Sequence, residues 1–180
     1  MPKSHLILGG RRSGKSAFAE NLALASGLPK IYLATSRAYD ADHAARIACH
    51  KTRREGQGWR VVEVPNPMDV PPQLDLLAQE PAVVLLDCLS MWLNNLFLDR
   101  PLDPQQDHGP NHREVPDLTL PKGQATLLVV SSEVGLGIHP ETALGRQYAD
   151  ALGTLNQSIA AQADQVTLVT AGLPLCLKSS

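Results

Sequence analysis

The sequence predicts a single α/β domain with a mainly parallel, doubly wound sheet and flanking helices. Three observations support this fold class. A short apolar run at residues 5–8 leads into a glycine-rich loop and then into a helix-forming stretch at residues 15–25. Further short apolar runs alternate with stretches of helical composition, as in a parallel sheet. Two of the runs, 83–86 and 127–130, are continuously apolar, which is typical of parallel strands buried on both faces.

The remaining elements follow the same pattern along the chain. Its 180 residues suffice for one core and are few for two, so we expect one domain over residues 1–180. A helix is expected over residues 42–54 and another in the apolar stretch that begins at Leu89. Between about residues 99 and 123 the composition turns to Pro, Asp, Gln, His and Gly, which predicts a polar loop or insertion. Strands are expected at residues 5–8, 31–34, 61–64, 82–87, 126–131 and 166–170.

Composition and charge exclude several classes of protein. The 16 basic and 18 acidic residues nearly balance, and the longest basic cluster is short, which argues against a nucleic-acid partner. Three widely spaced cysteines without a CxxC pair indicate reduced thiols rather than disulfides or a zinc site. The sequence contains neither a signal-type apolar region nor an apolar segment long enough to span a bilayer. We therefore expect a cytoplasmic protein with a small anionic ligand.

The glycine-rich loop carries the clearest chemical signal. It matches GxxxxGKS and stands between a predicted strand and a predicted helix, the context that this phosphate-binding motif requires. Glycines let backbone N–H groups surround phosphate oxygens, and the helix N-terminus adds a positive dipole. Lys15 would contact the outer phosphates, and the Ser16 hydroxyl would bind Mg²⁺. The loop is Gly9, Gly10, Arg11, Arg12, Ser13, Gly14, Lys15 and Ser16.

Two acidic residues stand at the ends of apolar strands. Asp87 ends the run 83–86, where a carboxylate can hold Mg²⁺ opposite Ser16. It can also cap the helix that follows, and both roles stay open. Glu133 follows the run 127–130 and is expected near a sugar, a base or a metal ion.

The predicted helix 42–54 places basic residues at three- and four-residue spacings. Arg46, His50, Arg53 and Arg54 therefore lie on or near one face. Such a face beside a phosphate loop suits an anionic ligand. Composition alone makes His50 an ordinary surface histidine.

Several ordered segments resemble the bifunctional adenosylcobinamide kinase/adenosylcobinamide-phosphate guanylyltransferase family of cobalamin biosynthesis. The phosphate loop is followed by Tyr32-Leu33-Ala34-Thr35 and then by Arg46-Ile47-Ala48-Cys49-His50. Similar segments continue through Trp59, Glu63 and Pro65, through residues 85–95, through Glu133-Val134-Gly135 and through residues 171–175. The resemblance covers nearly the whole chain.

The resemblance implies two reactions at one triphosphate site. The chain would phosphorylate adenosylcobinamide with ATP or GTP and then transfer GMP from GTP to adenosylcobinamide phosphate. His50 would be the nucleophile that forms a guanylyl-histidine, with Lys15 and Mg²⁺ (or Mn²⁺) stabilising the departing pyrophosphate. Arg46, Arg53, Arg54 and Glu63 become candidate nucleotide contacts, and a homotrimer is implied.

Two alternatives remain on the sequence alone. A plain P-loop kinase for another small alcohol would leave His50 without a covalent role. A nucleotide-dependent switch would bind without rapid turnover, but the guanine-reading Asn-Lys-x-Asp signature of switch GTPases is missing from the sequence.

Overall fold

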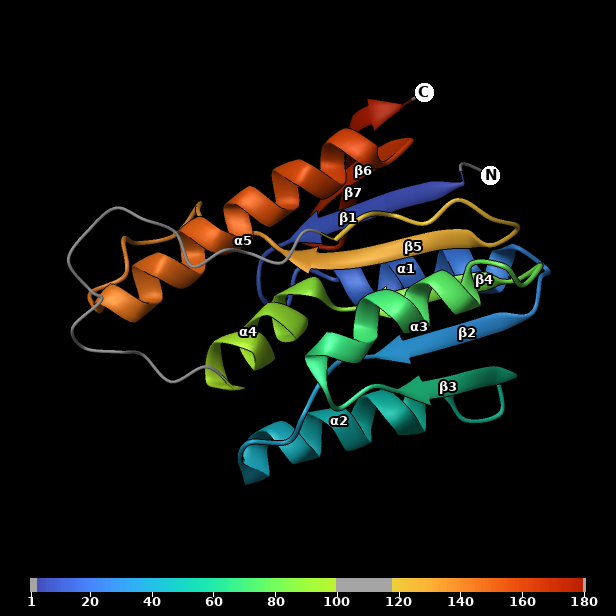
Figure 1. The fold of residues 1–180 in the computed structure, drawn as a ribbon, viewed down its shortest axis with the longest axis horizontal. Coiled ribbons are helices and arrows are strands. Elements are labelled where there is room, and N and C mark those ends of the chain that lie inside the picture. The colour runs from blue at the N-terminus through green and yellow to red at the C-terminus, as the bar shows by residue number, and fades with distance from the viewer. Residues whose placement is uncertain (1–2, 100–117, 180) are drawn as a thin grey trace.

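The fold is described from a computed structural model, which describes residues 3–99 and 118–179. Its elements follow one another as strand, helix, strand along most of the chain (Figure 1). In order they are β1 (Ser4–Gly9), α1 (Lys15–Ala25), β2 (Lys30–Ala34), α2 (Ala41–Arg54), β3 (Trp59–Glu63), the short 3₁₀ helix η1 (Pro67–Asp69), α3 (Val70–Leu77), β4 (Val83–Asp87), α4 (Leu89–Asp99), β5 (Thr126–Ser132), α5 (Ala143–Gln162), β6 (Gln165–Thr170) and β7 (Leu173–Ser179).

One seven-stranded sheet organises these elements in the order β3-β2-β4-β5-β1-β6-β7. Strands β1 to β6 pair in parallel, and β7 pairs antiparallel with β6 at the edge. Strand β5 lies between β1 and β4. The carboxyl ends of the parallel strands therefore meet at one edge of the sheet, which is where ligands bind in open α/β folds.

Alternate side chains of the central strands pack into two cores, one on each face. Leu6, Val84 and Val129 belong to the larger core, together with residues of α3, α4 and α5. Ile7 and Leu85 belong to the smaller core, together with residues of α1. Helices on both faces explain why the runs 83–86 and 127–130 of the central strands are continuously apolar, as the sequence predicted.

The predicted fold class is confirmed, and two regions differ from expectation. Strand β7 was not predicted, since all seven of its residues are exposed and it contains Pro174, which suits only an edge strand. In the predicted polar loop at 99–123, Asp99 ends α4 and residues 100–117 lie outside the described residues. Leu118 and Leu120 are buried in the larger core, because Gln162 of α5 binds the backbone around them.

Candidate active site

The phosphate loop joins β1 to α1 in the geometry that the motif predicts. A Cβ atom added to Gly9 would lie 2.4 Å from Ser13 Oγ and 2.5 Å from the Val169 carbonyl oxygen, so only glycine fits there. Gly14 has a φ of 96°, a left-handed conformation that glycine adopts without strain. The Ser13 carbonyl accepts a hydrogen bond from Gly172 N at 2.9 Å, so the β6–β7 turn supports the loop.

The basic residues of the loop differ in their surroundings. Lys15 is half-buried, and its Nζ donates to the Gly10 carbonyl oxygen at 3.2 Å. Its ammonium group therefore lies over the loop, where it can meet phosphate oxygens. Arg11 and Arg12 are exposed.

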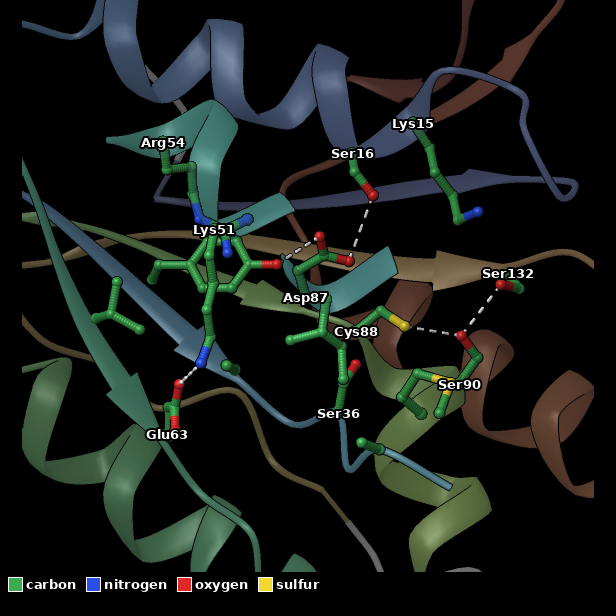
Figure 2. A pocket seen from close by; sticks show the side chains of 16 residues that line it. Lys15, Ser16, Ser36, Lys51, Arg54, Glu63, Asp87, Cys88, Ser90 and Ser132 are labelled. Atoms are coloured by element: carbon green, nitrogen blue, oxygen red, sulfur yellow. Dashed lines mark hydrogen bonds and ion pairs between the residues drawn. The ribbon is translucent and has the colours of Figure 1, made fainter. Parts of the chain in front are cut away.

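Asp87 and Ser16 come together beneath this loop, from β4 and α1. Ser16 Oγ donates to Asp87 Oδ1 at 3.4 Å, and Tyr32 Oη donates to Asp87 Oδ2 at 2.9 Å (Figure 2). Two neighbouring ligands of an octahedral Mg²⁺ ion, each at about 2.1 Å, lie about 3 Å apart, which the Ser16–Asp87 pair nearly matches. Residues 3–99 and 118–179 contain no group of three His, Cys, Asp or Glu side chains that could hold a metal. One carboxylate and one hydroxyl suit a Mg²⁺ ion held partly by substrate phosphates.

Tyr32 is buried beside this carboxylate. Burial, followed by the negative charge of Asp87, raises the pKa of Tyr32 well above its ordinary value. The phenol therefore stays protonated and acts as a donor to Asp87.

A pocket of about 440 Å³ extends from the phosphate loop to α2 and β3. Lys51 and Glu63 lie at the end away from the loop, where Lys51 Nζ is 2.6 Å from Glu63 Oε1 (Figure 2). Three further residues follow strand ends and were not predicted as site residues. They are Ser36 after β2, Cys88 after β4 and Ser132 at the end of β5. The rule that ligands lie at the carboxyl ends of parallel strands could have identified them.

The Cys88 thiol is not suited to act as a nucleophile. Burial, with a contribution from Asp87, raises its pKa to about 11. Its Sγ lies 3.0 Å from Ser90 Oγ, which in turn lies 3.0 Å from Ser132 Oγ. These side chains form a polar wall of the pocket.

Helix α2 contains all four residues of the expected basic face. The side chains of Arg46 and His50 lie outside the described part of the structure, although both residues are within α2. Arg53 and Arg54 both pair with Glu20 of α1, with 3.4 Å between Arg54 Nη1 and Glu20 Oε1. Arg54 lines the pocket, whereas Arg53 is exposed outside it.

Glu133 follows β5, as expected from the sequence. Its Oε1 accepts a hydrogen bond from Gly135 N at 2.7 Å, which orders the following turn. Its backbone N–H donates to the Gly9 carbonyl oxygen at 3.1 Å, so Glu133 lies next to the start of the phosphate loop.

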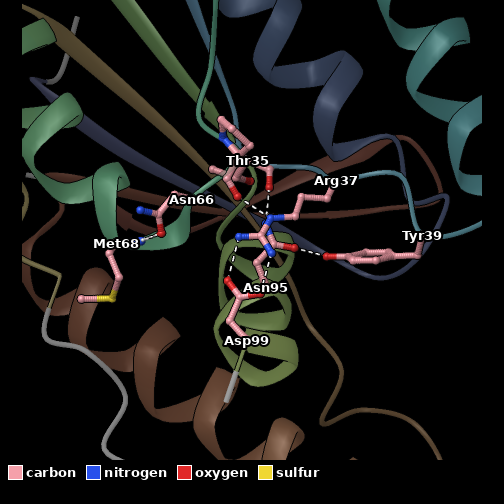
Figure 3. Close-up of polar contacts among 8 residues, drawn as sticks. Thr35, Arg37, Tyr39, Asn66, Met68, Asn95 and Asp99 are labelled. Atoms are coloured by element: carbon pink, nitrogen blue, oxygen red, sulfur yellow. Dashed lines mark hydrogen bonds and ion pairs between the residues drawn. The ribbon is translucent and has the colours of Figure 1, made fainter. Parts of the chain in front are cut away.

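The segment between β2 and α2 is fastened to α4 by side chains that the sequence did not single out (Figure 3). Buried Asn95 donates to the Thr35 carbonyl oxygen at 2.6 Å and accepts from Tyr39 Oη. Arg37 forms a two-pronged ion pair with Asp99, with N–O distances of 2.6 and 2.7 Å. These contacts fix the entry to α2 relative to the sheet edge.

Comparison with known proteins agrees with this arrangement. A sequence model of the family described as cobinamide kinase / cobinamide phosphate guanyltransferase matches residues 5–177. The Pseudomonas aeruginosa protein named bifunctional adenosylcobalamin biosynthesis protein CobP is 43% identical over 96% of this chain and 96% of its own length. The Salmonella typhimurium protein named bifunctional adenosylcobalamin biosynthesis protein CobU is 37% identical over 96% of this chain and 98% of its own length.

Two solved structures share the fold at low sequence identity. The ATPase EscN from the type III secretion system of enteropathogenic E. coli has a TM-score of 0.55 at 10% identity. A second ATPase of a type III secretion system has a TM-score of 0.51 at 11% identity. The matches cover 94% and 93% of this chain, which spans 43% and 51% of those proteins. They show the P-loop ATPase fold alone.

Proposed function

This chain belongs to the cobinamide kinase / cobinamide phosphate guanyltransferase family, and on that premise we propose how its site performs both reactions. In the first, the γ-phosphoryl group of ATP or GTP passes to the hydroxyl group of adenosylcobinamide. In the second, GMP passes from GTP to adenosylcobinamide phosphate, which gives adenosylcobinamide-GDP. The single observation that carries the proposal is the contact between Ser16 and Asp87 beneath a complete phosphate loop.

The phosphoryl step needs positioning and charge neutralisation. The backbone of the phosphate loop, the N-terminus of α1 and the Lys15 ammonium surround the triphosphate. Ser16 and Asp87 would hold Mg²⁺ or Mn²⁺, and the ion would supply positive charge beside the phosphate oxygens. Gly10, Arg11, Arg12 and Ser13 complete the loop, and Glu133 is a further nucleotide-binding candidate at its base.

The guanylyl step uses His50 as the nucleophile. Neutral imidazole attacks the α-phosphorus of GTP, a P–N bond forms, and the bond to pyrophosphate breaks. A phosphate oxygen of adenosylcobinamide phosphate then attacks the same phosphorus and releases the histidine. Lys15 would stabilise the departing pyrophosphate, and a metal ion held by Ser16 and Asp87 would supply further positive charge there.

Residues at the far end of the pocket would receive the rest of the nucleotide. Glu63 and Arg54 line this end, and Lys51 pairs with Glu63 across it. Arg46 and Arg53 are proposed as phosphate contacts from the same helix. A phosphate contact of Arg53 would compete with the ion pair that Arg53 forms with Glu20.

We further propose that the enzyme works as a homotrimer in the cytoplasm, with no nucleic-acid partner. Leu173, Leu175 and Leu177 on β7 are each more than half exposed, which supports association through apolar contacts. No helix within residues 3–99 and 118–179 is long and apolar enough to cross a membrane. Light scattering of the purified protein tests the trimer.

Intact mass spectrometry after incubation with GTP and Mg²⁺ tests the central step. We expect the wild-type protein to gain the mass of one guanylyl group and His50→Ala to gain none. His139→Ala is the matched control, because His139 is exposed and does not line the pocket. GTP binding without any mass gain in the wild type would refute the guanylyl-histidine and leave a plain kinase or a switch.

A further inference from the structure

Helix α2 has very little apolar anchoring. Among the residues of α2 whose side chains the structure describes, Arg54 is the one that is buried. Ile47 is half-buried and faces the pocket, and the remaining described residues are exposed. Among the described side chains of α2, Arg54 at the last turn is therefore the main buried anchor, in addition to the contacts that fix the entry to the helix.

Arg54 packs against the ring of Tyr32, the residue whose hydroxyl donates to Asp87 at the proposed metal site. Its guanidinium carbon lies 3.5 Å from the centre of the Tyr32 ring, within cation–π distance. Arg54 Nη1 also pairs with Glu20, which is 5% exposed. Tyr32 Oη donates to Asp87 at 2.9 Å, and Asp87 accepts from Ser16. A continuous set of contacts thus joins the last turn of α2 to the proposed metal site (Figure 2).

Helical spacing relates this anchor to the proposed nucleophile. Ile47, Lys51 and Arg54 line the pocket, and their separations of four and three residues define one face of α2. His50 precedes Arg54 by four residues, so its position in the sequence falls on the same face one turn earlier. A shift of Arg54 on the Tyr32 ring would move the His50 position relative to the phosphate loop.

From these contacts we infer that Tyr32 and Arg54 act together as positioning residues, which set the metal-site carboxylate and the nucleophile-bearing helix at one fixed separation. The inference rests on the proposed function. It assigns two different roles: Tyr32 orients Asp87, which both reactions need, and Arg54 orients α2, which the guanylyl step alone needs. Arg54 also lines the pocket and is proposed above as a nucleotide contact, and the positioning role is inferred in addition to that contact.

The test compares Tyr32→Phe, Arg54→Lys and the double variant. Phenylalanine keeps the ring under Arg54 and removes the hydroxyl on Asp87, whereas lysine keeps the charge beside Glu20 and loses the planar stack. Single-turnover guanylyl transfer is followed by intact mass, phosphoryl transfer by chromatography of the corrinoid product, and GTP affinity by calorimetry. Arg60→Gln is the matched control, since Arg60 forms an exposed pair with Glu80 at 2.5 Å and does not line the pocket.

We expect Tyr32→Phe to slow both steps by about tenfold or more, because misplacing a reacting group by about 1 Å costs up to about 100-fold. Arg54→Lys should slow guanylyl transfer by a similar factor and phosphoryl transfer by less than about threefold. GTP affinity should stay within about threefold in Tyr32→Phe, and any loss of affinity in Arg54→Lys should be smaller than its loss of guanylyl rate. The double variant should show both losses in guanylyl transfer, because Tyr32→Phe removes the contact with Asp87 and Arg54→Lys removes the stack on the ring.

Three results would overturn the inference. Guanylyl rates near that of the wild type would do so, as would equal losses of phosphoryl and guanylyl transfer in Arg54→Lys. A loss of GTP affinity that accounts for the loss of rate would make Arg54 a binding residue instead. If the wild type forms no guanylyl-protein, the proposed guanylyl step fails separately, and Tyr32→Phe still decides the inference through the phosphoryl step.

Discussion

Two adjacent glycines of the phosphate loop allow one chemical change to be tested in two environments. In Gly9→Ala the new methyl group would lie 2.5 Å from the Val169 carbonyl oxygen and 2.4 Å from Ser13 Oγ. Carbon–oxygen contacts are rarely shorter than about 3.3 Å, so the backbone of β6 would have to move by about 0.8 Å. Overpacking of this kind costs about 1–3 kcal/mol of unfolding free energy. For a domain of this size, that lowers Tm by about 2–12 °C.

Gly10→Ala should behave in the opposite way. No atom lies within 4 Å of the position of its added Cβ, and Gly10 is not among the glycines with positive φ. Alanine then restricts the unfolded chain and stabilises the protein by up to about 1 kcal/mol. Calorimetry of both variants without nucleotide measures the difference. An unchanged Tm in Gly9→Ala, or an equal fall in both variants, would refute the steric argument.

Four further predictions concern Asn95, Arg37, Cys88 and His5, the last of which lies in β1 and does not line the pocket. Asn95→Ala should lower the free energy of unfolding, measured in urea, by about 1–3 kcal/mol, because the buried Thr35 carbonyl loses its hydrogen-bond donor. Arg37→Ala should cost less than about 1 kcal/mol, since its ion pair with Asp99 is exposed to solvent. Maleimide should label the exposed cysteines of the native protein at neutral pH and spare Cys88 until the chain unfolds, as intact mass will show, because that thiol is buried and has a raised pKa. Burial lowers the pKa of His5, so the unfolded chain binds a proton that the folded chain does not, and stability should fall as pH drops below about 6.5. Unfolding of His5→Gln between pH 7 and 5 should show a smaller fall than the wild type.

Each of these has a contradicting result. Equal costs for the asparagine and the arginine variants would mean that burial does not decide the energy of these contacts. Rapid labelling of Cys88 in the native protein would show that the pocket wall opens. If the stability of His5→Gln depended on pH as that of the wild type does, His5 would not contribute to the loss of stability at low pH.

The sequence predicted the parts of the fold that depend on local pattern. Strand β1, the phosphate loop and the helix at Lys15–Ala25 were predicted because glycine and lysine spacing and apolar runs mark them directly. Strand β7 could not be predicted, since its stability comes from pairing with β6 and its side chains bury nothing. The strand order could not be predicted either, because it depends on which apolar segments pair across long sequence separations.

The candidate site shows the same division. Ser16 and Asp87 were predicted to face one metal from opposite sides, whereas the structure brings their oxygens within 3.4 Å, which suits neighbouring ligand positions. The partners of Arg53 and Arg54 were not predicted, since Glu20 is 34 residues from Arg54 and resembles any helix glutamate in the sequence. Tyr32 belonged to a recognised segment, but its contact with Asp87 depends on the pairing of β2 with β4.

The pairing of β1 with strands from the far part of the chain has a consequence for synthesis. Strand β1 begins at Ser4, yet its partners β5 and β6 begin at Thr126 and Gln165. At about 5–20 residues per second, the first strand waits roughly 6–24 s on the ribosome before its first neighbour has been made. During that time the phosphate loop lacks the walls that hold it, so GTP cannot stabilise the nascent chain. The early chain must therefore fold without help from a bound nucleotide.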